Sequence, residues 1–474
     1  MAAEGLDHLA GARVLVAGAG VTGAPTAKAL LALGAEVTVT DASAEKLAAL
    51  ATELPAIDTA LGLTEPPAGT RLVVTSPGWR PSTPLLAAAA EAGIEVIGEV
   101  ELAWRICATD ADPPTWLVVT GTNGKTTTVS MLAAILHAAG QDAVACGNIG
   151  LPVITAVAAG HRVLAVELSS FQLYWSPSVR PDVGLLLNIA PDHLDWHGDL
   201  AGYIAAKARV LTGTVAIAGI DDDLVAGLLT EAPAGTRYGL TMAEPDAGQF
   251  GIRAGQLVDR ATVAEAGTVL LPAAEVHPPG PSGVFDALAA AAVARAHGVG
   301  ESAIAEGLRG FRPGGHRGVE VGELDGVRYL DDSKASNPHA AAAAIRAHDR
   351  VVWVAGGLLK GASVDELVIE LGSRLVGAVL LGTDREVIAA ALARHAPDVP
   401  VHLAAAGDHD AMAVMVDAVT AAGELAGPGD VVLLAPAGAS WDMFTDYAHR
   451  GRAFAEALAA VAAQRQLARP GDRS

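Results

Sequence analysis

A glycine-rich segment that ends in a lysine and three threonines carries the clearest chemistry in the sequence. It follows an apolar run, Trp116–Val119, and precedes a helical pattern from Thr126 to His137. Glycines let backbone N–H groups close around phosphate oxygens, and a helix N-terminus adds partial positive charge. In such loops the lysine reaches the terminal phosphates and the threonine hydroxyl binds Mg²⁺. The segment therefore predicts an ATP site built from Gly121, Thr122, Asn123, Gly124, Lys125, Thr126 and Thr127.

This loop is shorter than the usual phosphate-binding loop, which has four residues between its glycines. Here only Thr122 and Asn123 separate the two glycines. A tight turn with a solvated lysine is the alternative interpretation. The strand pattern before the loop and the helical pattern after it favour phosphate binding.

Glu167 lies near the end of a second apolar strand pattern, Arg162–Leu168. Burying a carboxylate is costly unless it is paired or bound to a metal. In an α/β sheet this end of the strand faces the ligand. We therefore expect Glu167 to bind Mg²⁺ or the nucleotide.

Two histidines and a lysine follow Glu167. His193 and His197 are four residues apart, which admits a zinc site. Because Gly198 makes a continuous helix doubtful, a site for Mg²⁺ or Mn²⁺ with one histidine and carboxylates, or a solvated loop, remains open. Lys207 stands among small and apolar residues, a setting in which lysine normally extends to solvent.

The N-terminal region contains a second glycine motif, Gly18-Ala-Gly20-Val-Thr-Gly23, between a strand pattern and an alanine-rich helical pattern. With Asp41 at the end of the next strand, it matches a dinucleotide site. A close-packed turn without a ligand, or a loop for the diphosphate of another nucleotide, fits equally well. Ser76 and Gly78 follow a further strand, at the edge where such folds bind ligands.

The C-terminal third places polar groups at three predicted strand ends. Lys334 follows Asp331-Asp332, Lys360 follows a pair of glycines, and Ser440 follows the last apolar strand. Cations and a hydroxyl at one edge suit an anionic small molecule.

Length and composition restrict the class of protein. A chain of 474 residues suggests about three domains. The net charge of −22 argues against a nucleic-acid partner. Two cysteines, no signal-peptide pattern and no apolar stretch of ~18 residues predict a soluble cytosolic protein without a membrane span. Glu99 and Glu101 are expected on a solvated helix face.

Four motifs together resemble the Mur ligase family. They are Thr120-Gly-Thr-Asn-Gly-Lys-Thr-Thr, Glu167-Leu-Ser-Ser-Phe-Gln, Asn188-Ile-Ala-Pro-Asp-His-Leu-Asp and Asp332-Ser-Lys-Ala-Ser-Asn. The resemblance implies three α/β domains. These are a Rossmann-like domain for the UDP-linked substrate (1–110), a P-loop ATPase-like domain (111–311), and a Rossmann-like domain for the amino acid (312–474), entered through a hinge at residues 313–318.

The resemblance also implies an activity: ATP-dependent addition of D-glutamate to UDP-N-acetylmuramoyl-L-alanine through an acyl phosphate, in peptidoglycan precursor synthesis, by a monomer. Lys125, Glu167, His193 and Lys207 match the catalytic positions. Thr126, Glu167, His193 and a carbamylated Lys207 match the Mg²⁺ (or Mn²⁺) ligands, and Arg317 and Asp332 match residues that reach ATP.

The remaining positions carried over from the family bind the other substrates. For the uridine substrate they are Gly18, Gly20, Val21, Thr22, Asp41, Ser76, Gly78 and Asn148, and for D-glutamate Lys334, Ser336, Lys360, Ser440 and Phe444. The sequence departs from the family where asparagines that help hold the adenine are usual. There it reads Gly280-Pro-Ser-Gly283-Val-Phe-Asp286. Ala42-Ser43 and Gly318 also differ from the usual arginine and aromatic residue.

Overall fold

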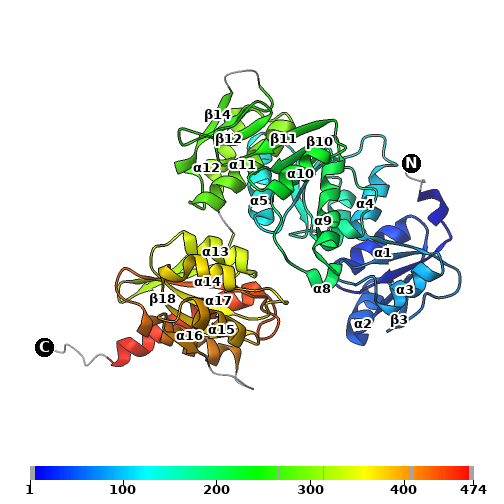
Figure 1. Ribbon diagram of the computed structural model, residues 1–474. Helices are drawn as coiled ribbons and strands as arrows, with labels where there is room; N and C mark the ends of the chain where they lie inside the picture. Colours follow the sequence, from blue (N-terminus) through cyan, green and yellow to red (C-terminus); the bar gives the residue numbers. More distant parts are fainter. Residues whose placement is uncertain (1–5, 264–266, 313, 405–409, 469–474) are drawn as a thin grey trace. The chain divides into compact units, whose positions relative to one another are not determined.

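A computed structural model describes residues 6–263, 267–312, 314–404 and 410–468, and it contains three separate sheets flanked by helices (Figure 1). The expectation of three α/β domains is thereby confirmed. The chain forms two compact units, one of Met1–Ile189 with Trp196–Phe311 and one of Ala190–Asp195 with Arg312–Ser474. Residue 313 of the predicted hinge lies outside the described residues.

The N-terminal sheet is parallel and has the strand order β3-β2-β1-β4-β5. Because all five strands run parallel, their carboxyl ends lie together at one edge. The strands are β1 (Arg13–Ala17), β2 (Glu36–Asp41), β3 (Asp58–Leu61), β4 (Thr70–Thr75) and β5 (Glu95–Gly98). The helices are α1 (Gly23–Ala32), α2 (Ala44–Glu53), α3 (Pro84–Glu91) and α4 (Glu99–Cys107).

The middle sheet has the order β14-β13-β12-β11-β10-β9-β6-β8-β7, so the phosphate-loop strand β6 lies between β8 and β9. The strands are β6 (Thr115–Thr120), β7 (Ala143–Gly147), β8 (Val163–Glu167), β9 (Val183–Leu186), β10 (Val215–Gly219), β11 (Thr236–Leu240), β12 (Gln249–Arg253), β13 (Gln256–Asp259) and β14 (Thr268–Pro272). The helices are α5 (Lys125–Ala138), α6 (Val153–Ala158), α7 (Ser170–Tyr174), α8 (Leu194–His197), α9 (Leu200–Ala208), α10 (Asp223–Glu231), α11 (Pro281–Ala296) and α12 (Glu301–Gly310).

Helix α5, which carries the phosphate-loop lysine, packs against α11 and α12 (Figure 1). The alanines of α11 from Ala287 to Ala292 are fully buried, so small side chains let these helices approach closely. The strands β12–β14 form an antiparallel extension from a region in which the sequence shows no clear period.

The C-terminal sheet has the order β15-β16-β20-β17-β18-β19, parallel except for β15. The strands are β15 (Val319–Leu324), β16 (Val327–Asp331), β17 (Val351–Gly356), β18 (Leu375–Leu381), β19 (Val401–Leu403) and β20 (Val431–Ala437). The helices are α13 (Pro338–Arg346), α14 (Asp365–Leu371), α15 (Arg385–His395), α16 (Ala411–Leu425) and α17 (Tyr447–Ala468). Across the described ranges of the whole chain, no helix is long and apolar enough to span a membrane.

The placement expected for Glu99 and Glu101 is wrong. Both are buried in α4, which packs against α6 of the middle domain, with 1% and 0% of their surface exposed. Glu101 accepts hydrogen bonds from Arg105 Nε (2.9 Å) and the Ser178 amide (3.0 Å). The acidic face of the helix packs against another domain and is not exposed to water. The local sequence cannot predict this, because it depends on which domain packs there.

Candidate active site

The phosphate loop has the predicted strand, glycine turn and helix. Gly124 has a left-handed backbone (φ 83°), which glycine adopts at low cost, and α5 begins at Lys125. Lys125 Nζ donates to the carbonyls of Gly121 (2.9 Å) and Thr122 (2.8 Å). The lysine is therefore turned back over its own loop, where a bound phosphate would meet it.

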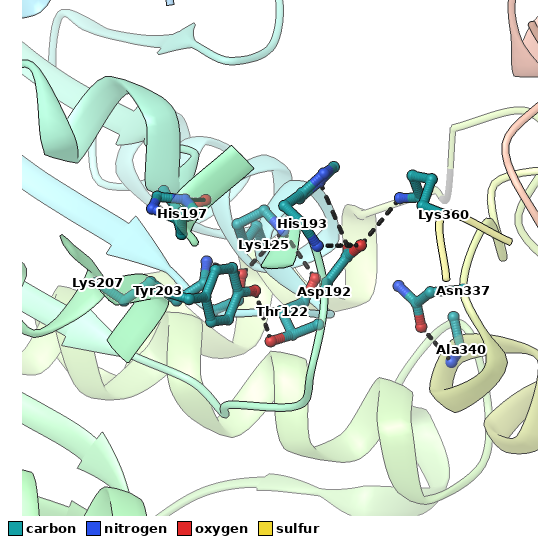
Figure 2. A network of polar contacts seen from close by, with 12 residues as sticks. Thr122, Lys125, Asp192, His193, His197, Tyr203, Lys207, Asn337, Ala340 and Lys360 are labelled. Atoms are coloured by element: carbon teal, nitrogen blue, oxygen red, sulfur yellow. Dashed lines mark hydrogen bonds and ion pairs between the residues drawn. The ribbon is translucent and has the colours of Figure 1, made fainter. Parts of the chain in front are cut away.

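Lys207 does not extend to solvent. Its side chain is 2% exposed, and Nζ donates to the Gly121 carbonyl at 2.7 Å and lies 4.9 Å from the centre of the Tyr203 ring (Figure 2). The Tyr203 hydroxyl in turn hydrogen-bonds Thr122 Oγ1 at 2.9 Å. Lys125 and Lys207 thus direct two ammonium groups at one carbonyl oxygen, which creates a strongly positive loop.

Glu167 lies beside this loop, because β8 is paired with β6 in a register that sets Glu167 opposite Val119. The side chain is 1% exposed. Oε1 accepts a hydrogen bond from Asn148 Nδ2 at 2.8 Å, while Oε2 is buried without a hydrogen-bond partner among the described residues. A buried carboxylate oxygen left in this state fits a cation ligand. Asn148, predicted to contact the uridine substrate, orients this carboxylate.

A zinc site based on His193 and His197 does not form. His193 precedes α8 with a left-handed backbone (φ 55°), so the two histidines do not share a helical face. His197 Nε2 hydrogen-bonds Ser170 Oγ (2.9 Å), and its ring stacks on Phe171. Within the residues described, no group of three or more His, Cys, Asp or Glu side chains is arranged to hold a metal.

The segment Ala190–Asp195 belongs to the unit that contains the C-terminal sheet. There Asp192 Oδ1 accepts a hydrogen bond from Lys360 Nζ at 2.9 Å (Figure 2). Burial alone would raise the pKa of Asp192, but the charges of His193 and Lys360 hold it below its usual value. The predicted role of His193 as a metal ligand stays a prediction.

The first glycine loop is tied to the ends of its neighbouring strands. Asp41 Oδ2 accepts the Ala19 amide at 2.8 Å, and Oδ1 accepts the Ser43 amide. Although burial opposes it, these backbone hydrogen bonds lower the pKa of Asp41. Thr22 Oγ1 lies 3.3 Å from Ser76 Oγ, and any side chain at Gly18 would collide with that serine.

Three other predicted uridine-substrate residues lie in the loops at this edge of the sheet. Val21 is 80% exposed at the tip of the first glycine loop. The Gly78 carbonyl accepts a hydrogen bond from Trp196 Nε1 at 3.2 Å. Gly20 has open space where a side chain would begin. The exposed Val21 side chain and the free space beside Gly20 would allow a planar ring of the substrate to pack here.

Three loops of the C-terminal domain meet at one edge of its sheet. The Ala437 amide donates to Ala335 O (2.9 Å), and Leu358 and Ala439 exchange two backbone hydrogen bonds. Lys334 Nζ lies 3.9 Å from the centre of the Tyr447 ring. The loops that carry Lys334, Lys360 and Ser440 are therefore brought together, as their positions at strand ends predicted.

Arg450 is a residue of this site that the sequence analysis missed. It is fully buried in α17, and it donates to Ser333 Oγ (2.9 Å), Ser333 O (2.8 Å) and Gly438 O (3.0 Å). Burial lowers the pKa of Arg450 to about 10, so it remains charged at neutral pH. A single arginine inside a long helix gives no signal in the sequence.

The other predicted residues of this domain differ in exposure. Asp332 has a pKa raised to about 7 by burial, with the charge of Arg317 opposing the rise. Ser440 and Phe444 are buried (3% and 5% exposed), and Phe444 packs in a hydrophobic cluster. Ser336 lies in the loop before Asn337, which caps α13 by accepting the Ala340 amide (2.9 Å; Figure 2). The ligand roles of these residues stay predictions.

Asp286 occupies one of the positions where the sequence departs from the family. It is buried in α11, with Oδ1 close enough to Gly124 that a side chain there would collide with it. In the segment expected to depart from the family, this chain therefore places a carboxylate against the phosphate loop.

A shortened phosphate loop with a buried carboxylate beside it, in a chain with two further α/β domains, defines a class of multidomain nucleotide-dependent enzymes. Comparison with known families identifies which one. Residues 12–98 match the Mur ligase MurD-like N-terminal domain, 119–294 the Mur ligase middle domain, and 316–438 the Mur ligase glutamate ligase domain. The chain belongs to the Mur ligase family.

Similar proteins cover nearly the whole chain. UDP-N-acetylmuramoylalanine–D-glutamate ligases from Mycolicibacterium smegmatis and Mycobacterium tuberculosis (strain H37Rv) are each 52% identical; the matches cover 95% and 96% of this chain and 97% of each relative. Among solved structures, MurC from Thermotoga maritima shares the fold with a TM-score of 0.56 at 16% identity, over 95% of this chain and 99% of that one. MurF from Thermotoga maritima, in complex with ADP, gives 0.55 at 17% identity, over 91% and 96%.

Proposed function

We propose that this chain joins D-glutamate to UDP-N-acetylmuramoyl-L-alanine at the expense of ATP, in the synthesis of peptidoglycan precursors. The observation that carries the proposal is the full-length identity of 52% to ligases of that name. Two lysines converge on the phosphate loop, and Glu167 keeps a buried carboxylate oxygen that has no hydrogen-bond partner in the described part of the chain. These groups supply the chemistry that such a ligase needs.

Each of the three domains then binds one substrate. Residues 1–110 bind the uridine diphosphate moiety at the loop Gly18–Gly23. Under this proposal the glycine motif does not bind NAD, and it is not a turn without a ligand. Residues 111–311 bind ATP, and residues 312–474 bind D-glutamate near Lys334 and Lys360. The domain boundaries at about 110 and 311 are part of this proposal.

The reaction has two steps. A carboxylate oxygen of the L-alanine residue attacks the γ-phosphorus of ATP and ADP leaves, which gives an acyl phosphate. The D-glutamate amine then attacks the acyl carbon, loses a proton, and expels inorganic phosphate, so that an amide bond forms. Because both partners in the first step are anions, the site must offset their repulsion. Lys125 does so with fixed positive charge in a preorganised loop, which is most of what phosphoryl transfer requires.

A divalent cation fits the site, because Glu167 Oε2 is buried without a hydrogen-bond partner among the described residues and Asn148 holds the other oxygen. Glu167, with the Thr126 hydroxyl, would hold Mg²⁺ or Mn²⁺. Mg²⁺ keeps several waters and phosphate ligands, so a full set of protein ligands is not required. Bound there, the metal neutralises charge on the phosphates.

Lys207 is proposed to carry a carbamate. Burying an ammonium group is costly, and Lys125 already directs a second one at the same carbonyl. Carbamylation converts the lysine into an anion that can bind Mg²⁺, and intact-mass measurement under gentle conditions would detect the added carbon dioxide. We also expect the protein to be a monomer and to be located in the cytosol. Sedimentation would test the oligomeric state.

The decisive experiment measures ADP and phosphate formation from ATP with UDP-N-acetylmuramoyl-L-alanine, with and without D-glutamate. D-Glutamate-dependent phosphate release supports the proposal. A sibling ligase would respond better to L-alanine, L-glutamate or meso-diaminopimelate, and a nicotinamide enzyme would bind NAD tightly and ignore ATP. Glu167→Gln keeps an oxygen for Asn148 but removes the charge, so it should raise the Mg²⁺ concentration needed for half-maximal rate.

A further inference from the structure

Asn188, two residues after the end of β9, makes an unusual set of contacts with the phosphate loop. Its Oδ1 accepts the amides of Thr122 (3.1 Å) and Asn123 (2.9 Å), and its Nδ2 donates to the Asn123 carbonyl (3.2 Å). Its backbone carbonyl also accepts the Thr122 amide at 3.0 Å. One asparagine therefore bonds the backbone of both residues that separate the two glycines.

We infer that Asn188 braces the shortened phosphate loop and is a positioning residue for ATP. This inference deepens the proposed function and rests on it for the identity of the nucleotide. In a loop of usual length, successive backbone N–H groups surround the phosphates. Here the amides of Thr122 and Asn123 bond to Asn188, so phosphate contacts fall to the N-terminus of α5 and to Lys125.

The bonding pattern continues the β-sheet. Strand β9 pairs with β6 in parallel, and the Leu187 amide donates to Thr120 O at 2.9 Å just before the loop. The side-chain amide of Asn188 then offers the same acceptor and donor as a peptide group. It bonds the loop backbone where the ladder ends. Leu187 lies so close to Gly121 that a side chain on this glycine would collide with it.

A competing interpretation is that Asn188 Oδ1 holds the place of a phosphate oxygen and leaves when ATP binds. The Nδ2 hydrogen bond to the Asn123 carbonyl argues against it, because a phosphate oxygen cannot donate a hydrogen bond to a carbonyl. The two interpretations predict opposite signs for the same substitution. If Asn188 braces the loop, its removal should weaken ATP binding. If it holds the place of a phosphate oxygen, its removal should free two backbone amides and strengthen ATP binding.

The test compares Asn188→Ala with the wild type in two measurements. Equilibrium binding of ATP with Mg²⁺ should weaken about tenfold, the effect of losing one or two net hydrogen bonds. Amide hydrogen exchange should accelerate in residues 121–124 and stay unchanged in the loop 333–337 of the other unit. Thr230→Ala removes one side-chain hydrogen bond from exposed α10 and serves as a control that should change neither.

The outcomes separate the brace from the proposed function. Failure of the wild type to bind ATP would reject the proposed function, while the exchange measurement would still decide whether Asn188 braces the loop. Tighter ATP binding by Asn188→Ala, or unchanged exchange in residues 121–124, would overturn the inference. If Asn188→Ala does not fold, Asn188→Ser, which adds no charge and cannot reach both amides, takes its place in the same measurements.

Discussion

Two glycine turns in this molecule each present a lysine at the end of a parallel strand, and they are supported in different ways. In the middle domain Lys125 bonds its own loop, and that loop is hydrogen-bonded to Asn188, just beyond the end of the adjacent strand β9. In the C-terminal domain Lys360 has a left-handed backbone (φ 56°) and pairs with Asp192. Its neighbouring loops are held by Arg450, which is 117 residues from Ser333 in the chain.

The difference teaches which sites can be recognised in a sequence. A glycine loop that leads directly from a strand into its own helix has a recognisable local pattern. A group of loops supported by a buried charge on a distant helix has only scattered polar residues. The two regions are also expected to fail differently when they are altered: the first in nucleotide chemistry, the second in amino-acid binding.

The largest effect is expected from Lys125→Ala. Loss of the phosphate-directed cation should lower the rate of ADP formation roughly 10²–10³-fold. The circular dichroism spectrum should stay unchanged, because Lys125 is partly buried at a loop and donates to carbonyls of that loop. Lys360→Ala should instead raise the KM for D-glutamate and leave ATP binding intact. Lys28→Ala, an exposed lysine, is the control. Normal phosphate release by Lys125→Ala would remove the basis of the comparison.

Lys207→Ala should lower activity roughly 10- to 100-fold, the usual cost of disturbing a group that supports a metal site. If the lysine carries a carbamate, formate or acetate should restore part of the activity, because a small carboxylate can occupy the vacated position. Titration of activity against formate provides the measurement. A fully active Lys207→Ala variant would show that the lysine has a structural role and does not support a metal site.

Arg450→Met tests the C-terminal side of the comparison. The substitution keeps the volume but leaves the Ser333 and Gly438 carbonyls without their buried donor, so the loops should move apart. The KM for D-glutamate should rise about tenfold while ATP affinity is unchanged. Arg452→Met, on the exposed side of the same helix, is the matched control. Equal loss of ATP affinity would show that Arg450 supports overall stability and not the amino-acid loops.

Much of the fold and part of the site could be predicted because local physical chemistry determines them. Asp199 and Asn337 cap their helices, a role for which Asp and Asn are preferred, and α5 follows its glycine loop. Lys125 and Glu167 lie where strand ends predict. Arg450 could not be found in this way, because its importance depends on which carbonyls the tertiary structure brings to it.

The smallest effect on activity is expected from Glu99→Gln, which tests remote support on the phosphate-loop side. Glu99 Oε2 accepts the Ile154 amide (3.2 Å), and Oε1 is buried without a hydrogen-bond partner among the described residues. Burial raises the pKa of Glu99 from 4.5 to about 7. The folded protein therefore binds more protons than the unfolded chain between these pH values, and the free energy of unfolding falls as pH rises through them.

Glutamine cannot ionise, so the free energy of unfolding of Glu99→Gln should match that of the wild type near pH 4.5. As pH rises, the variant should become more stable than the wild type, by at most about 3 kcal/mol above pH 7. Urea unfolding at several pH values measures this, and activity should stay within about twofold because the oxygen still accepts the Ile154 amide. Glu101→Gln is the contrast, since it breaks a buried pair with Arg105 and should destabilise the protein by a few kcal/mol. A large loss of activity in Glu99→Gln, with an unchanged pH dependence of stability, would contradict this. Both the Lys125 loop and the Lys360 loop would then depend on a distant buried charge, and the difference in how the two are supported would not hold.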